Sequence, residues 1–158
     1  MSTRASIYHH PIHPMLIVFP LGLWIFAFVC YAIYLLSEVP VWRVVSLYAM
    51  GGGIVGAALA AVPGVIDFLA LGQSRVQNIA LSHMISNIIG LTIFIIAFAL
   101  AVSSPDRVLV PFVLGIFGLL AIGIGGWLGG ALVYEHGVGV ECRPPQEAPE
   151  LQEVQKVP

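Results

Sequence analysis

The residues of this sequence that are best suited to chemistry are its five histidines. Two of them, His10 and His13, lie three positions apart in the segment His-Pro-Ile-His-Pro, where Pro11 and Pro14 restrict the backbone. A rigid turn can direct both imidazoles to one side, and neutral imidazole is a common nitrogen ligand of transition metals and haem iron. His13 lies deeper and is the stronger candidate. The alternative is that both histidines are interfacial and hydrogen-bond lipid headgroups or free helix-end backbone groups.

A second polar group lies on one face of a predicted helix. His83, Asn87, Gly90 and Phe94 are spaced so that they follow one another along that face. A ligand histidine needs an acceptor for its second ring nitrogen, and Asn87, or Asp67 from the preceding apolar segment, can provide one. The alternative is a single interhelical hydrogen bond of about 0.6 kcal/mol that only stabilises the helix bundle.

The last histidine, His136, follows the final apolar segment and directly precedes Gly137. A glycine often ends a helix, and a protonated histidine in the last turn interacts favourably with the negative helix end. The functional alternative is that Glu135 and His136 add a carboxylate and an imidazole to the other histidines. The sequence contains no nucleophile elbow, phosphate-binding loop, Cys-x-x-Cys pair or His-Glu-x-x-His motif, so hydrolytic and nucleotide chemistry have no support.

The composition indicates that these residues belong to a membrane protein. Of 158 residues, 59% are hydrophobic and 9% are charged, whereas about 25% of residues are charged in soluble domains. Four stretches without Lys, Arg, Asp or Glu, each long enough to cross about 30 Å of hydrocarbon, are residues 15–36, 44–66, 83–102 and 108–134. They predict an all-α fold, an integral membrane four-helix up-down bundle. The net charge of −2 predicts no nucleic-acid partner.

The predicted domain organisation has three parts. Residues 1–10 form an N-terminal tail, residues 11–137 a four-span membrane domain, and residues 138–158 an acidic, proline-rich tail whose composition predicts disorder. The connection over residues 67–82 is predicted to be interfacial. Within it, Ser74 is a suitable N-cap for a helix that continues into the third span.

An even number of spans places both chain termini and all five histidines on one side of the membrane. We call this side the histidine end, and the opposite side, with the connections 37–43 and 103–107, the loop end. Four Lys and Arg residues lie at the histidine end and two at the loop end, so the positive-inside rule predicts a multi-pass inner (cytoplasmic) membrane protein with both termini cytoplasmic. The loop end is predicted to contain two local ion pairs, Glu38 with Arg43 and Asp106 with Arg107.

Glycines are concentrated in the second and fourth predicted spans. Gly52 and Gly56, and likewise Gly125 and Gly129, have the four-residue spacing that lets helix backbones approach closely. Helix packing explains this pattern, and the alternative is a flat cofactor that lies against the glycine surface. The two predicted helical hairpins otherwise show only a loose likeness.

Several motifs stand out along residues 10–140: His10-Pro11-Ile12-His13-Pro14 followed by Pro20 and Gly22, the segment 61–67, His83 with Asn87, and the segment 129–140. Together they resemble a widespread bacterial family of four-helix membrane proteins, a domain of unknown function. The resemblance implies that members can be joined to or encoded beside Rieske-type or cytochrome-like redox proteins. It thereby favours electron transfer over transport.

Three functions fit these observations. The first is an integral membrane b-type haem-binding electron-transfer protein or subunit, a redox carrier rather than a catalyst. The second is a copper, zinc or iron binding or transport protein, and the third is a cofactor-free interaction subunit of a respiratory complex. The candidate cofactor-binding residues are, in order, His13, His83, His10, His136, Asn87 and Asp67. The four histidines are also the candidate metal ligands, with Asp67, Met15 or Met84 as additions. The expected partners are the lipid bilayer and a Rieske-type or cytochrome redox protein, and a homo-oligomer is left open.

Overall fold

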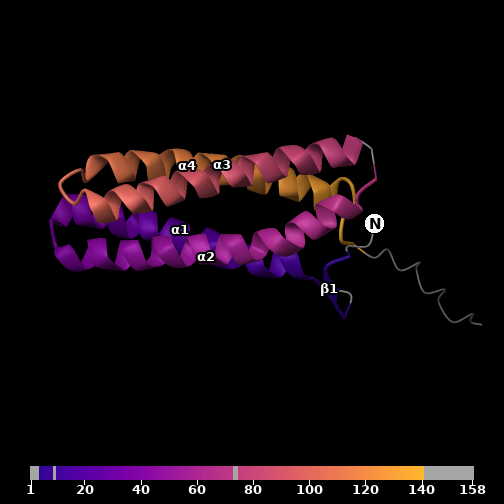
Figure 1. The fold of residues 1–158 in the computed structure, drawn as a ribbon, viewed down its shortest axis with the longest axis horizontal. Coiled ribbons are helices and arrows are strands. Elements are labelled where there is room, and N and C mark those ends of the chain that lie inside the picture. The colour runs from indigo at the N-terminus through magenta and orange to yellow at the C-terminus, as the bar shows by residue number, and fades with distance from the viewer. Residues whose placement is uncertain (1–3, 9, 73–74, 141–158) are drawn as a thin grey trace, which may run out of the picture.

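A computed structural model describes residues 4–8, 10–72 and 75–140, and four long helices contain most of them. These are α1 (Ile12–Ser37), α2 (Pro40–Ala70), α3 (Arg75–Ser103) and α4 (Leu109–Tyr134), joined up and down along one axis (Figure 1). Each is long and apolar enough to cross a membrane. The predicted all-α four-helix membrane bundle is therefore confirmed. Two short strands, β1 (Ser6–Ile7) and β2 (His10–Pro11), pair in an antiparallel ribbon before α1.

The helices extend beyond the uncharged stretches of the sequence, most clearly on both sides of the second connection. The second helix does not end at Pro63 but continues to Ala70, and Figure 1 shows it bending near this end. Helix α3 starts at Arg75, directly after the predicted N-cap Ser74, which itself lies outside the described residues. Polar residues at helix ends can reach the membrane surface, so a charge-free stretch underestimates helix length. Residues 141–158 of the predicted tail also lie outside the described residues.

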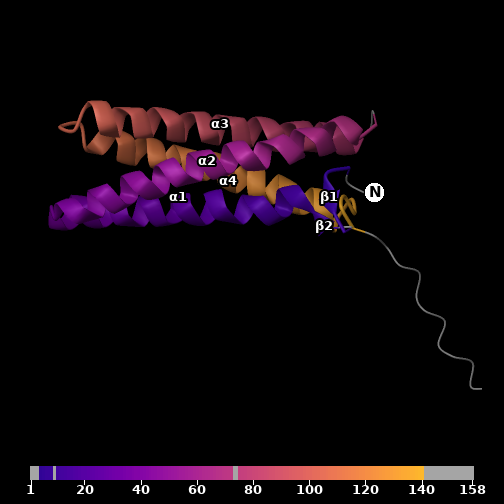
Figure 2. The ribbon, with the colours of Figure 1, turned by 60° about the horizontal axis from the view of Figure 1, so that its bottom comes forward.

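The bundle consists of two helical hairpins. In the first hairpin α1 packs along α2, and in the second α3 packs along α4. The two hairpins contact each other less extensively, through α2 with α3 and α1 with α4 (Figure 2). In addition, the ring of Trp24 in α1 stacks on that of Phe94 in α3, with ring centroids 4.3 Å apart. Ala27, Ala97 and Ile122 complete this buried layer.

Glycines let the helices of each hairpin approach closely around this stack. A Cβ atom on Gly53 would overlap the indole of Trp24, and one on Gly118 would lie 2.8 Å from a ring carbon of Phe94. Side chains of the bundle therefore already cover these glycines. At these two positions this supports the packing interpretation of the glycines.

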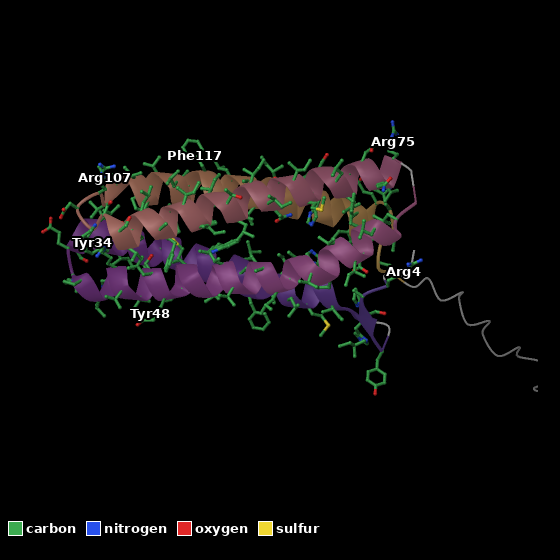
Figure 3. The ribbon with its side chains drawn as sticks, viewed as in Figure 1. Arg4, Tyr34, Tyr48, Arg75, Arg107 and Phe117 are labelled. Carbon is green, nitrogen blue, oxygen red and sulfur yellow. The ribbon has the colours of Figure 1, made fainter. Side chains whose placement is uncertain are left out.

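The outer surface is apolar, as a protein in a bilayer requires. Phe117 projects away from the bundle, and Arg107 lies at the loop end, whereas Arg4 and Arg75 lie at the opposite end (Figure 3). Large side chains such as Trp127, which is 81% exposed, face outward. The environment of these four spans is the lipid bilayer.

The two ion pairs predicted at the loop end do not form among the described residues. Glu38 ends α1 in a left-handed conformation, with its backbone N–H donated to Tyr34. The guanidinium of Arg43 instead reaches α3 and donates to the carbonyl oxygen of Ala101. Sequence proximity suggested these pairs, whereas helix packing directs Arg43 toward another helix.

Candidate functional site

Two histidines from different hairpins meet at the histidine end of the bundle. His13 is in the first turn of α1, and His83 lies two turns into α3. Their ring centroids are 6.0 Å apart, and the ring planes are nearly perpendicular, at 86°. The structure thus brings together the two histidines that the sequence ranked first.

Each of these imidazoles is held by a backbone carbonyl within its own hairpin. His13 Nδ1 lies 2.7 Å from the carbonyl oxygen of Ala60 in α2, and His83 Nδ1 lies 2.8 Å from that of Gly125 in α4. Because a carbonyl oxygen only accepts, Nδ1 must carry the proton. In the neutral ring Nε2 then keeps its lone pair, which is the arrangement of metal-binding histidines in proteins.

Glycine makes both carbonyls accessible to the rings. Gly64 and Gly129 each lie one helical turn after the accepting residue. A Cβ atom on Gly64 would lie 2.9 Å from His13 Nδ1, and one on Gly129 would lie 3.0 Å from His83 Cε1. A larger residue at either position would push the ring away from the carbonyl oxygen.

Asn87 lies beside His83, but it does not have the predicted role. Its amide nitrogen donates to the backbone carbonyl of His83 at 2.7 Å and lies almost equally far from both ring nitrogens, 3.3 Å from Nε2 and 3.4 Å from Nδ1. The acceptor for the Nδ1 proton is Gly125, not Asn87. Asn87 therefore lies against the imidazole ring, and its hydrogen bond to the His83 carbonyl supports the turn that carries the histidine.

Asp67 hydrogen-bonds the N-terminal segment and does not have the predicted role of orienting a histidine. Its Oδ1 accepts the backbone N–H of Ala5 at 2.8 Å, and the carbonyl of Ala5 accepts the N–H of Ile12 at 3.0 Å. The sequence could not show that the N-terminal segment folds back onto α2. Asp67 thus fixes this segment at the end of the bundle, beside the start of the helix that carries His13.

The other candidate histidines lie apart from the pair. His10 is exposed, and its Nδ1 lies 2.8 Å from the carbonyl oxygen of Tyr8 within the β1–β2 ribbon. His136 lies in the turn after α4, where the predicted glycine end is confirmed by Gly137 with φ of +63°. His9 lies outside the described residues. Within the described ranges, no group of three or more His, Cys, Asp or Glu is placed to hold a metal ion.

The two hairpins repeat the same contacts at the same spacing. In each hairpin, the aromatic residue of the central stack follows the histidine by eleven positions along the first helix. On the second helix, the residue whose carbonyl accepts from the histidine follows the glycine that packs against the aromatic ring by seven positions. The corresponding sets are His13, Trp24, Gly53, Ala60 and Gly64 in the first hairpin and His83, Phe94, Gly118, Gly125 and Gly129 in the second. The loose sequence likeness is therefore a structural repeat, and the matching spacing of histidine, aromatic residue and glycine is the sequence signal that points to the two carbonyl acceptors.

The sequence was compared with known families, curated proteins and solved structures. One family model, described as a predicted membrane protein (DUF2231), matches residues 9–142. No curated protein and no solved structure matches the chain.

Proposed function

The chain belongs to the DUF2231 family of predicted membrane proteins, and we propose that it is a membrane-embedded electron-transfer protein that binds haem b between its two hairpins. The observation that carries this proposal is the pair of His13 and His83. Their centroids are 6.0 Å apart, and backbone carbonyls hold both rings with Nδ1 protonated.

The spacing of the rings suits two ligands of one metal. Two imidazoles on opposite sides of a metal ion have centroids about 6 Å apart, because each nitrogen lies about 2 Å from the metal and about 1 Å from its ring centre. Haem iron takes its axial nitrogens from such side chains. The donor set therefore fits a haem with two histidine ligands.

The residues around the pair would prepare the imidazoles for this role. The carbonyls of Ala60 and Gly125 fix the tautomer and orientation of the rings and make Nε2 more basic. Asn87 would keep its 2.7 Å hydrogen bond to the His83 carbonyl. When bound, haem supplies one-electron chemistry. A Rieske-type or cytochrome protein, which the sequence resemblance implies, would be the redox partner.

The same pair favours a second candidate, a single copper, zinc or iron ion. Imidazole nitrogen suits all three metals, and the centroid spacing is equally compatible with one ion. The two candidates differ in colour and in metal content.

The proposal is tested on the full chain purified in detergent from haem-replete cells. We expect dithionite to produce a sharp alpha band in the reduced-minus-oxidised spectrum, because two strong nitrogen ligands give six-coordinate low-spin ferrous haem. Colourless protein with stoichiometric copper, zinc or iron by elemental analysis would favour the second candidate. Colourless, metal-free protein would contradict both and favour a cofactor-free interaction subunit.

We also propose that the chain lies in the inner (cytoplasmic) membrane, with the histidine end and both termini facing the cytoplasm. The excess of Lys and Arg at this end supports it. In a variant without Cys30 and Cys142, we expect a cysteine at Ser104 to react with an impermeant maleimide in intact cells, and one at Ser2 to react only after lysis. Labelling of the Ser2 position in intact cells would contradict this orientation.

A further inference from the structure

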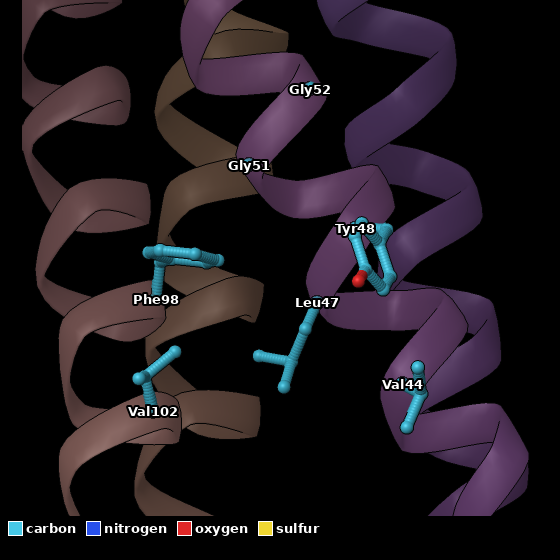
Figure 4. A pocket seen from close by; sticks show the side chains of 7 residues that line it. All are labelled: Val44, Leu47, Tyr48, Gly51, Gly52, Phe98 and Val102. Atoms are coloured by element: carbon cyan, nitrogen blue, oxygen red, sulfur yellow. The ribbon is translucent and has the colours of Figure 1, made fainter.

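A groove opens between α2 and α3 near the loop end, far from the histidine pair. It has a volume of about 380 Å³. Figure 2 shows the two helices diverging toward this end, and Figure 4 shows Phe98 and Val102 of α3 across from Leu47 of α2. The lining is almost entirely apolar and comprises Val44, Leu47, Tyr48, Gly51, Gly52, Phe98 and Val102.

A cation without a counter-ion lies at the loop end of this groove. Arg43 directly precedes Val44, and its guanidinium donates to Ala101, the neighbour of Val102. Its Nε is buried without a hydrogen-bond partner, and no carboxylate pairs with it among the residues that the structure describes. A partly buried charge of this kind is costly unless an anion accompanies it.

The size of the groove limits what can occupy it. Its volume of about 380 Å³ and its apolar lining suit one flexible apolar chain. In a bilayer, the molecules that combine such a chain with an anion at the membrane surface are acidic phospholipids.

We propose that this groove binds one anionic phospholipid, with an acyl chain between α2 and α3 and the headgroup phosphate at Arg43. The lipid supplies the missing counter-ion, and its chain fills the space where the hairpins diverge. The site is independent of the histidine pair, so it stands whether or not haem binds at the other end.

The test measures how lipids stabilise the full, delipidated chain in detergent. Phosphatidylglycerol and phosphatidylcholine with identical acyl chains are titrated while thermal unfolding is followed by circular dichroism. We expect phosphatidylglycerol to raise the unfolding temperature at about fivefold lower concentration than phosphatidylcholine, the factor expected for one arginine near an anionic lipid. Arg43→Gln should remove this preference, and Arg43→Lys should retain it.

Two further variants separate the groove from general charge effects. Gly51→Leu should abolish the response to both lipids, because a Cβ at this position already lies 3.4 Å from Phe98 and the longer side chain fills the groove. Should this variant fail to fold, Val102→Phe fills the same space from α3. The control Arg107→Gln, also at the loop end, should respond like the unaltered chain. The proposal would be overturned if the unaltered chain responded equally to both lipids, or if Arg43→Gln kept the preference for phosphatidylglycerol. A quinone that co-purifies with the chain in native mass spectra would also overturn it.

Discussion

Replacing either His13 or His83 with alanine should abolish the proposed haem binding and leave the bundle folded. Each substitution deletes one of the two imidazoles that would hold the haem iron. The cost to the fold is small, since each histidine contributes one hydrogen bond to a carbonyl, worth about 0.6 kcal/mol in a membrane protein. The stacked core around Trp24 lies several helical turns away. We expect haem content per chain to fall at least tenfold, measured from the reduced spectrum, with unchanged helicity by circular dichroism.

The chain offers matched controls for this experiment. His10 and His136 carry the same side chain at the same end of the bundle, but neither contacts the pair. Alanine at either position should leave haem content unchanged. Full haem occupancy in both His13→Ala and His83→Ala would place the ligands elsewhere and contradict the proposed site.

The largest effect on stability should come from a single methyl group at Gly53. Its Cβ would overlap the indole of Trp24, which is fixed by stacking on Phe94 and by a hydrogen bond of 3.3 Å from Nε1 to the carbonyl of Met50. The ring cannot move without breaking these contacts. Overpacking of this kind costs about 1–3 kcal/mol. Gly53→Ala should therefore unfold at a clearly lower temperature than the unaltered chain in the same detergent.

Gly126 provides the control, because nothing lies within 4 Å of a Cβ at this position. Gly126→Ala should be as stable as the unaltered chain or slightly more stable, since alanine is favoured over glycine in a helix by up to about 1 kcal/mol. Equal unfolding temperatures for Gly53→Ala and Gly126→Ala would show that the close approach at Trp24 is not tight.

The sequence predicted the four spans and the proximity of His13 and His83, but it did not predict which groups these histidines contact. The four spans follow from composition, and helix order alone places His13 and His83 at one end. Their carbonyl acceptors belong to other helices, so the register between the helices determines which carbonyl each imidazole meets. The wrong roles for Asp67 and Arg43 have the same origin: both partners, Ala5 and Ala101, are distant in sequence. Uncharged stretches and local spacing contain no information about such contacts.

The repeated hairpin has a consequence for the history of the chain. Each hairpin holds its own histidine by its own carbonyl, so one half already contains a complete, oriented ligand. Two identical hairpins paired about a two-fold axis would place two such ligands face to face, as symmetric homodimers do. Duplication and fusion of a gene for one hairpin would produce this arrangement and would then let each copy diverge. Trp24 opposite Phe94 and Ala60 in place of Gly125 are the differences expected from that divergence, while both histidines are retained.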